Sequence, residues 1–310
     1  MKFAFTFPGQ GSQSVGMMRA YGDHAAIRAT FEEAGDVLKT DLWTLVDVGP
    51  AEQLNQTSNT QPAMLAAGVA VYRLWRELGG AEPLVMAGHS LGEYTALTCA
   101  GAFDFADALR LVRTRAEAMQ AAVPEGQGGM AAILGLEDAV VEELCREAAQ
   151  GQVVAAVNFN CPGQVVIAGE RPAVERAMDL AKTRGAKRAL MLPVSVPSHC
   201  ALMQPAAEAL RQALAAVEIR APRIPVLHNV DVATHEAPTA IRTALTQQLY
   251  SPVRWVETVR AMRDMGVALV AECGPGKVLA GLNKRILGDI PTPALADAAS
   301  LAETLNSVKN

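Results

Sequence analysis

Short apolar runs alternate with helical patterns along the first part of the chain. The run at residues 2–7 ends at Pro8-Gly9, and a second run covers residues 84–87, so each predicts a buried strand. Apolar positions at helical spacing predict helices over about 23–36, 61–78, 93–99 and 105–123. Strands that alternate with helices in this way predict a parallel sheet with helices on both faces.

The order of the elements changes after the glycine-rich loop at residues 124–129. The pattern there predicts strand, helix, strand, strand, helix, strand, at residues 130–134, 137–149, 153–158, 164–168, 172–184 and 189–194. This is the order of the ferredoxin-like split unit. The chain then returns to α/β material, with helices predicted at 203–217 and 255–264 and strands at 225–229 and 268–272.

We therefore predict two structural units. A large α/β domain covers residues 1–125 and 198–310, and a small ferredoxin-like subdomain, residues 126–197, is inserted into it. A cleft is expected between the two, where ligands often bind.

Composition restricts the function classes. The chain has 310 residues, of which 50% are hydrophobic, yet no segment approaches the ~18 uncharged apolar residues of a membrane span. A net charge of -5 argues against a general nucleic-acid binder. The five cysteines lack C-x-x-C spacing, which favours reduced thiols over disulfides or a zinc site. The N-terminal apolar run is too short for a signal peptide. We expect a cytoplasmic enzyme that is a monomer and uses no metal ion.

The run Gly88-His89-Ser90-Leu91-Gly92 stands between a predicted strand and a predicted helix, as a nucleophile elbow does. The glycines allow a tight turn, and the helix start directs free N–H groups at the serine hydroxyl. This geometry suits acyl transfer through an acyl-serine. The alternative is a turn with a purely structural role, because the pattern G-x-S-x-G also arises by chance. The loop Pro8–Gln13 follows a strand and could offer further amides to an oxyanion.

A serine nucleophile needs a base, and histidine is the usual one. His199 is the best candidate among the five histidines, because it lies where the subdomain returns the chain to the large domain. His89 adjoins Ser90 but its side chain should diverge from it, so support of the elbow is expected there. A histidine in a loop more often has a structural role than a catalytic one. Here the nucleophile elbow at Ser90 makes the catalytic role the favoured interpretation. No acid is evident as a third member, so a backbone carbonyl could orient the base.

Arg115 falls within the apolar arc of the helix predicted at residues 105–123. A guanidinium there needs an anionic partner. One interpretation is an internal ion pair with a buried acid, and the other is a bidentate clamp on a substrate carboxylate.

Lys182, Arg184, Lys187 and Arg188 form a basic island in an acidic chain. The island is either a solvated helix end or a landing site for phosphates or an acidic partner.

Taken together, these motifs resemble those of the malonyl-CoA:acyl carrier protein transacylases of dissociated fatty acid synthesis. The resemblance spans nearly the whole chain. Besides the elbow, Arg115 and Gly274-Pro275-Gly276-Lys277, it rests on the segments Phe7–Gln13, Thr60–Ala63, Asn158–Gln164, Val196–His199 and Gln248–Val253.

The resemblance implies a hydrolase-like α/β core with a ferredoxin-like subdomain. It implies that Ser90 is acylated, that His199 is the base and that Arg115 binds the malonyl carboxylate. It further implies an oxyanion hole from the amides of Gln10 and Leu91. A carbonyl near Gln248 would orient the histidine. More weakly, it implies a substrate or coenzyme A pocket that includes Gln61, Asn160, Lys187 and Arg188.

The expected activity is ping-pong transfer of a malonyl group from malonyl-CoA to Ser90 and then to the phosphopantetheine thiol of an acyl carrier protein. No cofactor is expected, since malonyl-CoA is a substrate. The alternatives are a relative that serves polyketide synthesis, an acyl thioesterase with the same Ser-His site, and a carrier-protein binding scaffold without catalysis. Arg115 argues against a plain fatty-acyl substrate, and intact Ser90, His199 and Arg115 argue against the scaffold.

Overall fold

A four-stranded parallel sheet forms the centre of the large part of the molecule. The computed structural model describes residues 1–194 and 196–309. The strand order is β7-β2-β1-β8, where β1 is Phe3–Phe7, β2 is Val85–Gly88, β7 is Val226–Leu227 and β8 is Leu269–Glu272. Phe7 lies opposite Gly88 in the register of β1 and β2. The loop after β1 and the turn after β2 therefore leave the sheet side by side.

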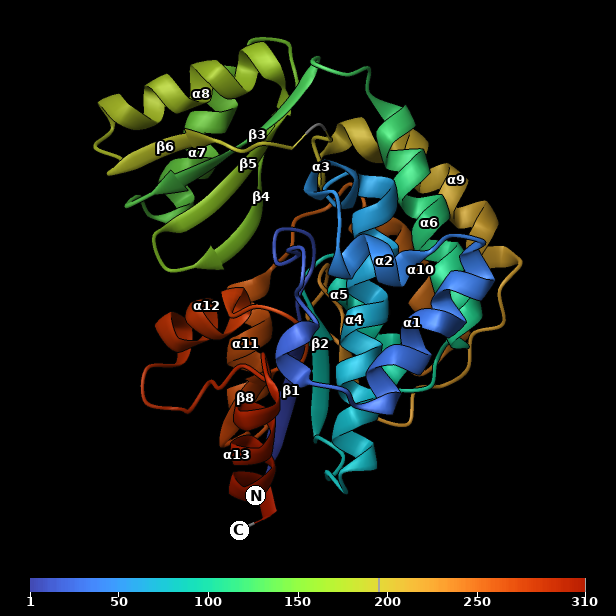
Figure 1. Cartoon of the computed structure of the whole chain (residues 1–310). Coiled ribbons are helices and arrows are strands. Elements are labelled where there is room, and N and C mark those ends of the chain that lie inside the picture. Colours follow the sequence, from blue (N-terminus) through green and yellow to red (C-terminus); the bar gives the residue numbers. More distant parts are fainter. Residues whose placement is uncertain (195, 310) are drawn as a thin grey trace.

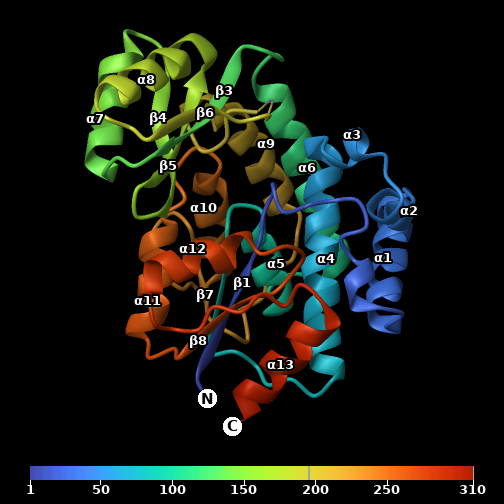
Figure 2. The same cartoon turned by 60° about the vertical axis from the view of Figure 1, so that its left-hand side comes forward.

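Helices cover both faces of this sheet (Figure 1). Phe3, Phe5 and Phe7 point to the face covered by Trp75, whereas Ala4 and Val85 point to the other face. The first face packs against α1 (Ala25–Leu38), α4 (Thr57–Glu77), α5 (Gly92–Cys99), α6 (Phe105–Ala122), α9 (Gln204–Ala215) and α10 (Pro238–Gln248). The second packs against α11 (Trp255–Asp264) and α12 (Val278–Leu287). Helix α13 (Ala298–Lys309) ends the described chain near the N-terminus (Figure 2).

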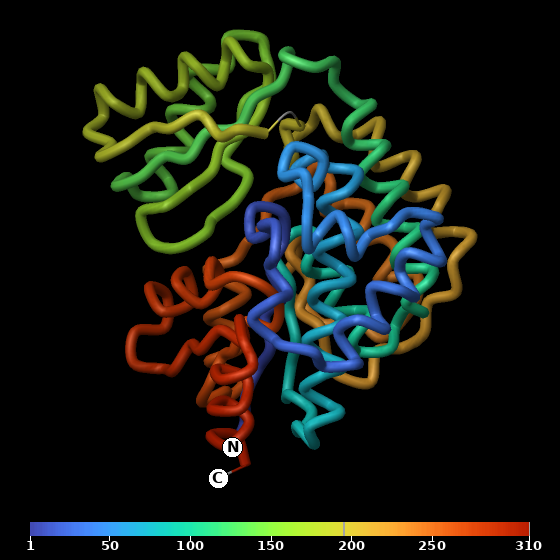
Figure 3. Tube along the Cα trace, in the orientation of Figure 1, coloured from blue at the N-terminus to red at the C-terminus, as the bar shows by residue number. Residues whose placement is uncertain are grey.

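A second sheet forms a separate layer above the carboxyl ends of the parallel strands (Figures 1 and 2). It is antiparallel, with the order β4-β5-β3-β6, and two helices cover one of its faces with their own apolar core. Its elements are β3 (Gly128–Leu134), α7 (Asp138–Ala149), β4 (Val154–Cys161), β5 (Gln164–Glu170), α8 (Arg171–Thr183) and β6 (Arg188–Met191). The predicted fold class, a parallel α/β core with a ferredoxin-like unit, is confirmed. Figure 3 shows the chain leaving α6 for this layer and returning to α9.

The structure differs from the sequence prediction at several elements. The strand predicted over 189–194 ends at Met191, and Pro193 has no N–H to extend the ladder. Helices α2 (Leu42–Asp47), α3 (Ala51–Leu54) and α10 were not predicted. In α10 only Ile241, Ala244, Leu245 and Gln248 are buried. Such a narrow stripe, interrupted by threonines, gives a weak periodic signal.

In residues 1–194 and 196–309, no helix has the length and apolar character needed to cross a bilayer. All five cysteines are buried and none is in a disulfide.

Candidate active site

Ser90 lies on a tight turn between β2 and α5. Its φ of 53° is in the left-handed region, which few non-glycine residues adopt. The flanking glycines are required by close backbone contacts. A Cβ on Gly88 would lie 1.8 Å from the Gly92 carbonyl carbon, and a Cβ on Gly92 would lie 2.0 Å from the Phe7 carbonyl oxygen. The turn therefore holds the serine hydroxyl beyond the sheet, at the start of α5.

His199 contacts Ser90 from the segment that follows the small sheet. Its Nε2 lies 2.8 Å from Ser90 Oγ, and its Nδ1 lies 2.7 Å from the backbone oxygen of Gln248. A carbonyl oxygen only accepts hydrogen bonds, so Nδ1 carries the hydrogen and Nε2 is free to accept the serine proton. Burial, and then the positive charge of Arg115, lower the pKa of His199 to about 3. The imidazole is thus neutral, as a general base must be before it accepts a proton.

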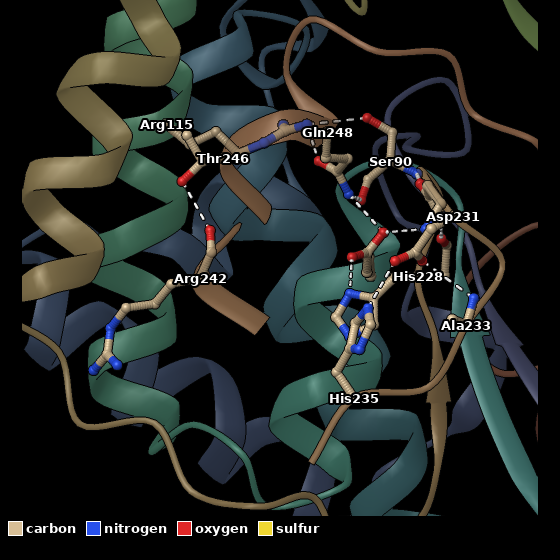
Figure 4. Close-up of polar contacts among 12 residues, drawn as sticks. Ser90, Arg115, His228, Asp231, Ala233, His235, Arg242, Thr246 and Gln248 are labelled. Carbon is tan, nitrogen blue, oxygen red and sulfur yellow. Dashed lines mark hydrogen bonds and ion pairs between the residues drawn. The ribbon is translucent and has the colours of Figure 1, made fainter. Parts of the chain in front are cut away.

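Arg115 reaches the same serine from α6 and is only 1% exposed. Its Nη2 donates to Ser90 Oγ at 3.1 Å and to Gln248 Oε1 at 3.0 Å, and its Nη1 donates to Gln61 Oε1 at 2.8 Å. Figure 4 shows Arg115 and Gln248 directed at Ser90. All three acceptors are uncharged, and Arg115 forms no ion pair with any described residue. The internal ion pair considered for Arg115 is therefore not found in the described parts of the chain. Burial lowers the pKa of Arg115.

These side chains open into a cavity of about 130 Å³ between the two sheets. Residues from the large part line one side, namely Gln10, Thr57, Gln61, His89, Ser90, Leu91, Arg115 and Met119. The other side is formed by the small sheet and the returning segment, namely Met130, Asn158, Leu192, Val194, Val196, Ser198 and His199. The backbone amides of Gln10 and Leu91 donate to no acceptor in the described residues. Both are therefore free to bind a ligand oxygen.

The remaining candidate residues lie outside this cavity. Asn160 does not line it, but its Oδ1 is 2.8 Å from Nε2 of the half-buried His89, which does. Lys187 and Arg188 are exposed at the outer edge of the small sheet, and neither forms an ion pair with a described residue. By contrast, Lys182 pairs with Asp179 at 2.8 Å and Arg184 pairs with Glu147 at 2.8 Å. Within the described chain, the basic island therefore consists of two cations in ion pairs, Lys182 and Arg184, and two without one, Lys187 and Arg188.

A polar network under Ser90 was missed by the sequence analysis. Glu93 and His228 are fully buried, and Glu93 Oε1 is 2.6 Å from His228 Nδ1. Asn229 Oδ1 accepts from the Ser90 amide at 2.8 Å, and Asn229 Nδ2 donates to the Gly88 carbonyl at 2.7 Å. The available signal was Glu93 itself. A carboxylate in a helix of otherwise apolar and small residues requires a buried partner.

No three His, Cys, Asp or Glu side chains within the described ranges come together as a bound metal would require. The absence of a metal or other cofactor from the reaction stays a prediction.

Comparison with known proteins places this geometry in context. The model of the acyl transferase domain family matches residues 4–298. The chain is 56% identical over 305 residues to the malonyl CoA-acyl carrier protein transacylase of Escherichia coli (strain K12). This alignment covers 98% of this chain and 99% of the relative.

Two solved structures of transacylases are similar to this chain over nearly their whole length. The malonyl CoA-acyl carrier protein transacylase of Coxiella burnetii superposes with a TM-score of 0.99 at 50% identity, over 100% of this chain and 98% of that one. A malonyl-transacylase solved in complex with a type II PKS acyl-carrier protein superposes with a TM-score of 0.98 at 55% identity, over 99% and 100% of the two chains.

Proposed function

Because the chain belongs to the acyl transferase family and, within it, to the malonyl CoA-acyl carrier protein transacylases, we propose that it transfers a malonyl group from malonyl-CoA to an acyl carrier protein through an acyl-serine. The observation that carries the proposal is the contact of one hydroxyl, Ser90 Oγ, with a neutral imidazole at 2.8 Å and a guanidinium at 3.1 Å. A base and a carboxylate-binding group thus converge on one nucleophile.

The first half-reaction begins at the Ser90 hydroxyl. As its oxygen attacks the thioester carbonyl of malonyl-CoA, its proton passes to His199 Nε2. The Gln248 carbonyl accepts from Nδ1–H at 2.7 Å and stabilises the imidazolium that forms. The carbon–sulfur bond then breaks, and the sulfur of coenzyme A takes the proton from His199. The product is a malonyl ester of Ser90.

The amides of Gln10 and Leu91, which have no acceptor among the described residues, are suited to bind the oxyanion of the tetrahedral intermediate. Both residues line the cavity beside Ser90. Leu91 also directly precedes α5, so the positive end of the helix dipole adds to its N–H. A preorganised donor of this kind contributes roughly 3–4 kcal/mol to the transition state.

Arg115 supplies the selectivity for a carboxylated acyl group. Three of the five guanidinium hydrogens are bound to Gln61, Gln248 and Ser90, and the Nε hydrogen has no acceptor in the described chain. As Ser90 Oγ turns to attack the thioester carbonyl, it gives up the Arg115 hydrogen bond. In the same step the guanidinium can bind the carboxylate at the other end of the malonyl group, with two parallel hydrogen bonds.

The second half-reaction reverses the first with a different thiol. The phosphopantetheine thiol of the carrier protein gives its proton to His199 as its sulfur attacks the ester carbonyl. The bond between the acyl carbon and Ser90 Oγ then breaks, Oγ takes the proton from His199, and the malonyl group leaves as a thioester of the carrier protein. Lys187 and Arg188 are exposed and form no ion pair with any described residue, so they are suited to bind the phosphates of coenzyme A or an acidic carrier surface.

The carrier protein has two candidate sources. The relative in Escherichia coli is named for an acyl carrier protein, and a structural neighbour is bound to a type II PKS carrier. We propose fatty acid synthesis as the pathway and treat a polyketide carrier as the second candidate. A cytoplasmic location accords with the five unpaired cysteines. The monomeric state stays a prediction.

Intact-mass analysis tests the function. Incubation with malonyl-CoA should add one malonyl group, and peptide mapping should place it on Ser90, while Ser90→Ala should gain nothing. The adduct should persist until a carrier protein with its phosphopantetheine thiol is added. Rapid release of free malonate without a carrier would indicate a thioesterase instead. Comparing a fatty acid carrier with a polyketide carrier would separate the two pathways.

A further inference from the structure

A buried carboxylate lies one side chain away from Arg115. The amide of Gln248 stands between them. Its Oε1 accepts from Arg115 Nη2 at 3.0 Å, and its Nε2 donates to Glu93 Oε2 at 2.9 Å (Figure 4). Arg115 is 1% exposed and Glu93 is fully buried. A cation and a carboxylate, both buried, therefore share one bridging amide.

The bridge is held in one orientation. Gln248 Nε2 also donates to the Ser90 carbonyl oxygen at 2.9 Å, and that oxygen can only accept. The amide nitrogen must therefore face Ser90 and Glu93, and the amide oxygen must face Arg115. Glu93 in turn is fixed by His228 Nδ1 at 2.6 Å and by the Asn229 amide at 2.9 Å. The carboxylate cannot approach the guanidinium directly.

Arg115 has no other negative neighbour among its contacts. Its hydrogen-bond acceptors are two amide oxygens and a hydroxyl, and its guanidinium lies 5.3 Å from the centre of the Tyr94 ring. A buried cation without compensation is strongly destabilising. Burial lowers the pKa of Arg115, and Tyr94 and Glu93 both oppose that change.

We propose that Glu93 is the remote counterion of Arg115 and that it limits how tightly the site holds a carboxylated acyl group. The inference rests on the proposed function. Glu93 stabilises the charged guanidinium in the free enzyme, but it repels a second carboxylate bound to the same guanidinium. A direct ion pair would occupy the donors that the malonyl group needs. The amide bridge supplies countercharge and leaves those donors usable.

The variant Glu93→Gln tests the charge with little change of shape. An amide oxygen can replace the carboxylate as acceptor, and its NH₂ can donate to His228 in the other tautomer. We expect acylation of Ser90 by malonyl-CoA to gain about threefold to tenfold over acylation by acetyl-CoA, relative to the wild type, because a repulsion specific to the carboxylate is removed. The two rate constants are measured by intact mass. A loss of folding alone would slow both acyl groups equally.

A matched control is Glu272→Gln, which neutralises another fully buried carboxylate that does not line the cavity. Its ratio of malonyl to acetyl acylation should equal that of the wild type. An unchanged or lower ratio in Glu93→Gln, or an equal rise in both variants, would overturn the inference. A wild type that forms no malonyl-serine would overturn the proposed function as well.

Glu93→Gln alone could fail to fold, since it leaves Arg115 without countercharge. The double variant Glu93→Gln/Arg115→Gln removes both charges, so that no buried cation is left without countercharge. It should fold and should unfold at a higher urea concentration than Glu93→Gln, with Arg115→Gln alone as the control. If the single variant is unfolded and the double variant is unfolded too, the countercharge is not what position 93 provides, and the inference is wrong.

Discussion

The Gln248 backbone oxygen accepts the Nδ1 hydrogen of His199 at 2.7 Å, where many serine enzymes have an acid. The side chain of the same residue accepts from Arg115 at 3.0 Å. One residue at the end of α10 therefore sets the tautomer of His199, the proposed base, and the position of Arg115, the proposed carboxylate-binding group.

The pH dependence of acylation should reflect the low pKa of His199. An ordinary histidine loses its activity as a base when the pH falls through about 6.5. With the pKa lowered to about 3, His199 stays neutral from pH 8 down to at least pH 5. We expect kcat/KM for malonyl-CoA, measured by stopped-flow acylation, to be nearly flat over that range. A descending limb centred near pH 6.5 would show that His199 titrates normally or that another histidine is the base.

Replacement of Arg115 should affect acyl groups unequally. Arg115→Ala should reduce malonyl transfer by roughly 2–4 kcal/mol in transition-state free energy, the scale of a lost buried charged contact. Acetyl transfer should fall far less, since no carboxylate is bound. Arg115→Lys should rescue poorly, because an ammonium cannot give two parallel hydrogen bonds. Steady-state kinetics with both thioesters measures the difference. Equal losses for malonyl and acetyl groups would assign Arg115 a structural role.

The two halves of the basic island should behave differently. Lys187→Glu with Arg188→Glu should raise the KM for the carrier protein and weaken its salt dependence, because no acid in residues 1–194 or 196–309 neutralises these exposed cations. If the two residues bind coenzyme A phosphates instead, the rise should appear in the KM for malonyl-CoA. The matched control is Lys182→Glu with Arg184→Glu, whose cations are already paired. A solvated helix end would leave both KM values unchanged in both double variants.

Glu272 should make stability depend on pH. Its Oε2 accepts from the Ala280 amide at the start of α12, its Oε1 has no partner in the described residues, and burial raises its pKa to about 7. The folded state thus favours the protonated carboxyl. The associated stability is present below the unfolded value near 4.3 and is lost as the pH rises through 7.

Glu272→Gln mimics the protonated form. It should stabilise the protein at pH 8 by roughly 1–3 kcal/mol and have little effect at pH 4.5. Urea denaturation at the two pH values measures both differences. A destabilised variant at pH 8 would mean that the ionised carboxylate is the better cap for α12.

The fold and the reacting groups could largely be anticipated from the sequence, because each has a local signal. The elbow at Ser90 follows from glycine spacing, and Arg115 follows from its position on an apolar helix arc. The network around Glu93 has no such signal. Its members, His228 and Asn229, are more than 130 residues away along the chain, and only the parallel pairing of β2 with β7 brings them beneath the elbow.

Helix α10 shows a second limit. Its narrow apolar stripe gives too weak a periodic signal to predict the helix. The expectation that a carbonyl near Gln248 orients His199 therefore comes only from the resemblance to a family. The contact between its backbone oxygen and His199 depends on where that helix ends, which no short-range pattern specifies.

Ser90 and His199 both have a positive φ, 53° and 66°. Glycine adopts this conformation without cost, whereas a residue with a Cβ loses roughly 1 kcal/mol. Glycine would therefore relieve the backbone strain at both positions, but it has no side chain that could act as the proposed nucleophile or base. If random variants are selected only for a higher melting temperature, substitutions to glycine at these two positions should be enriched, and those variants should be inactive. Directed evolution of a more stable form of this protein therefore has to include a selection for transfer activity in every round.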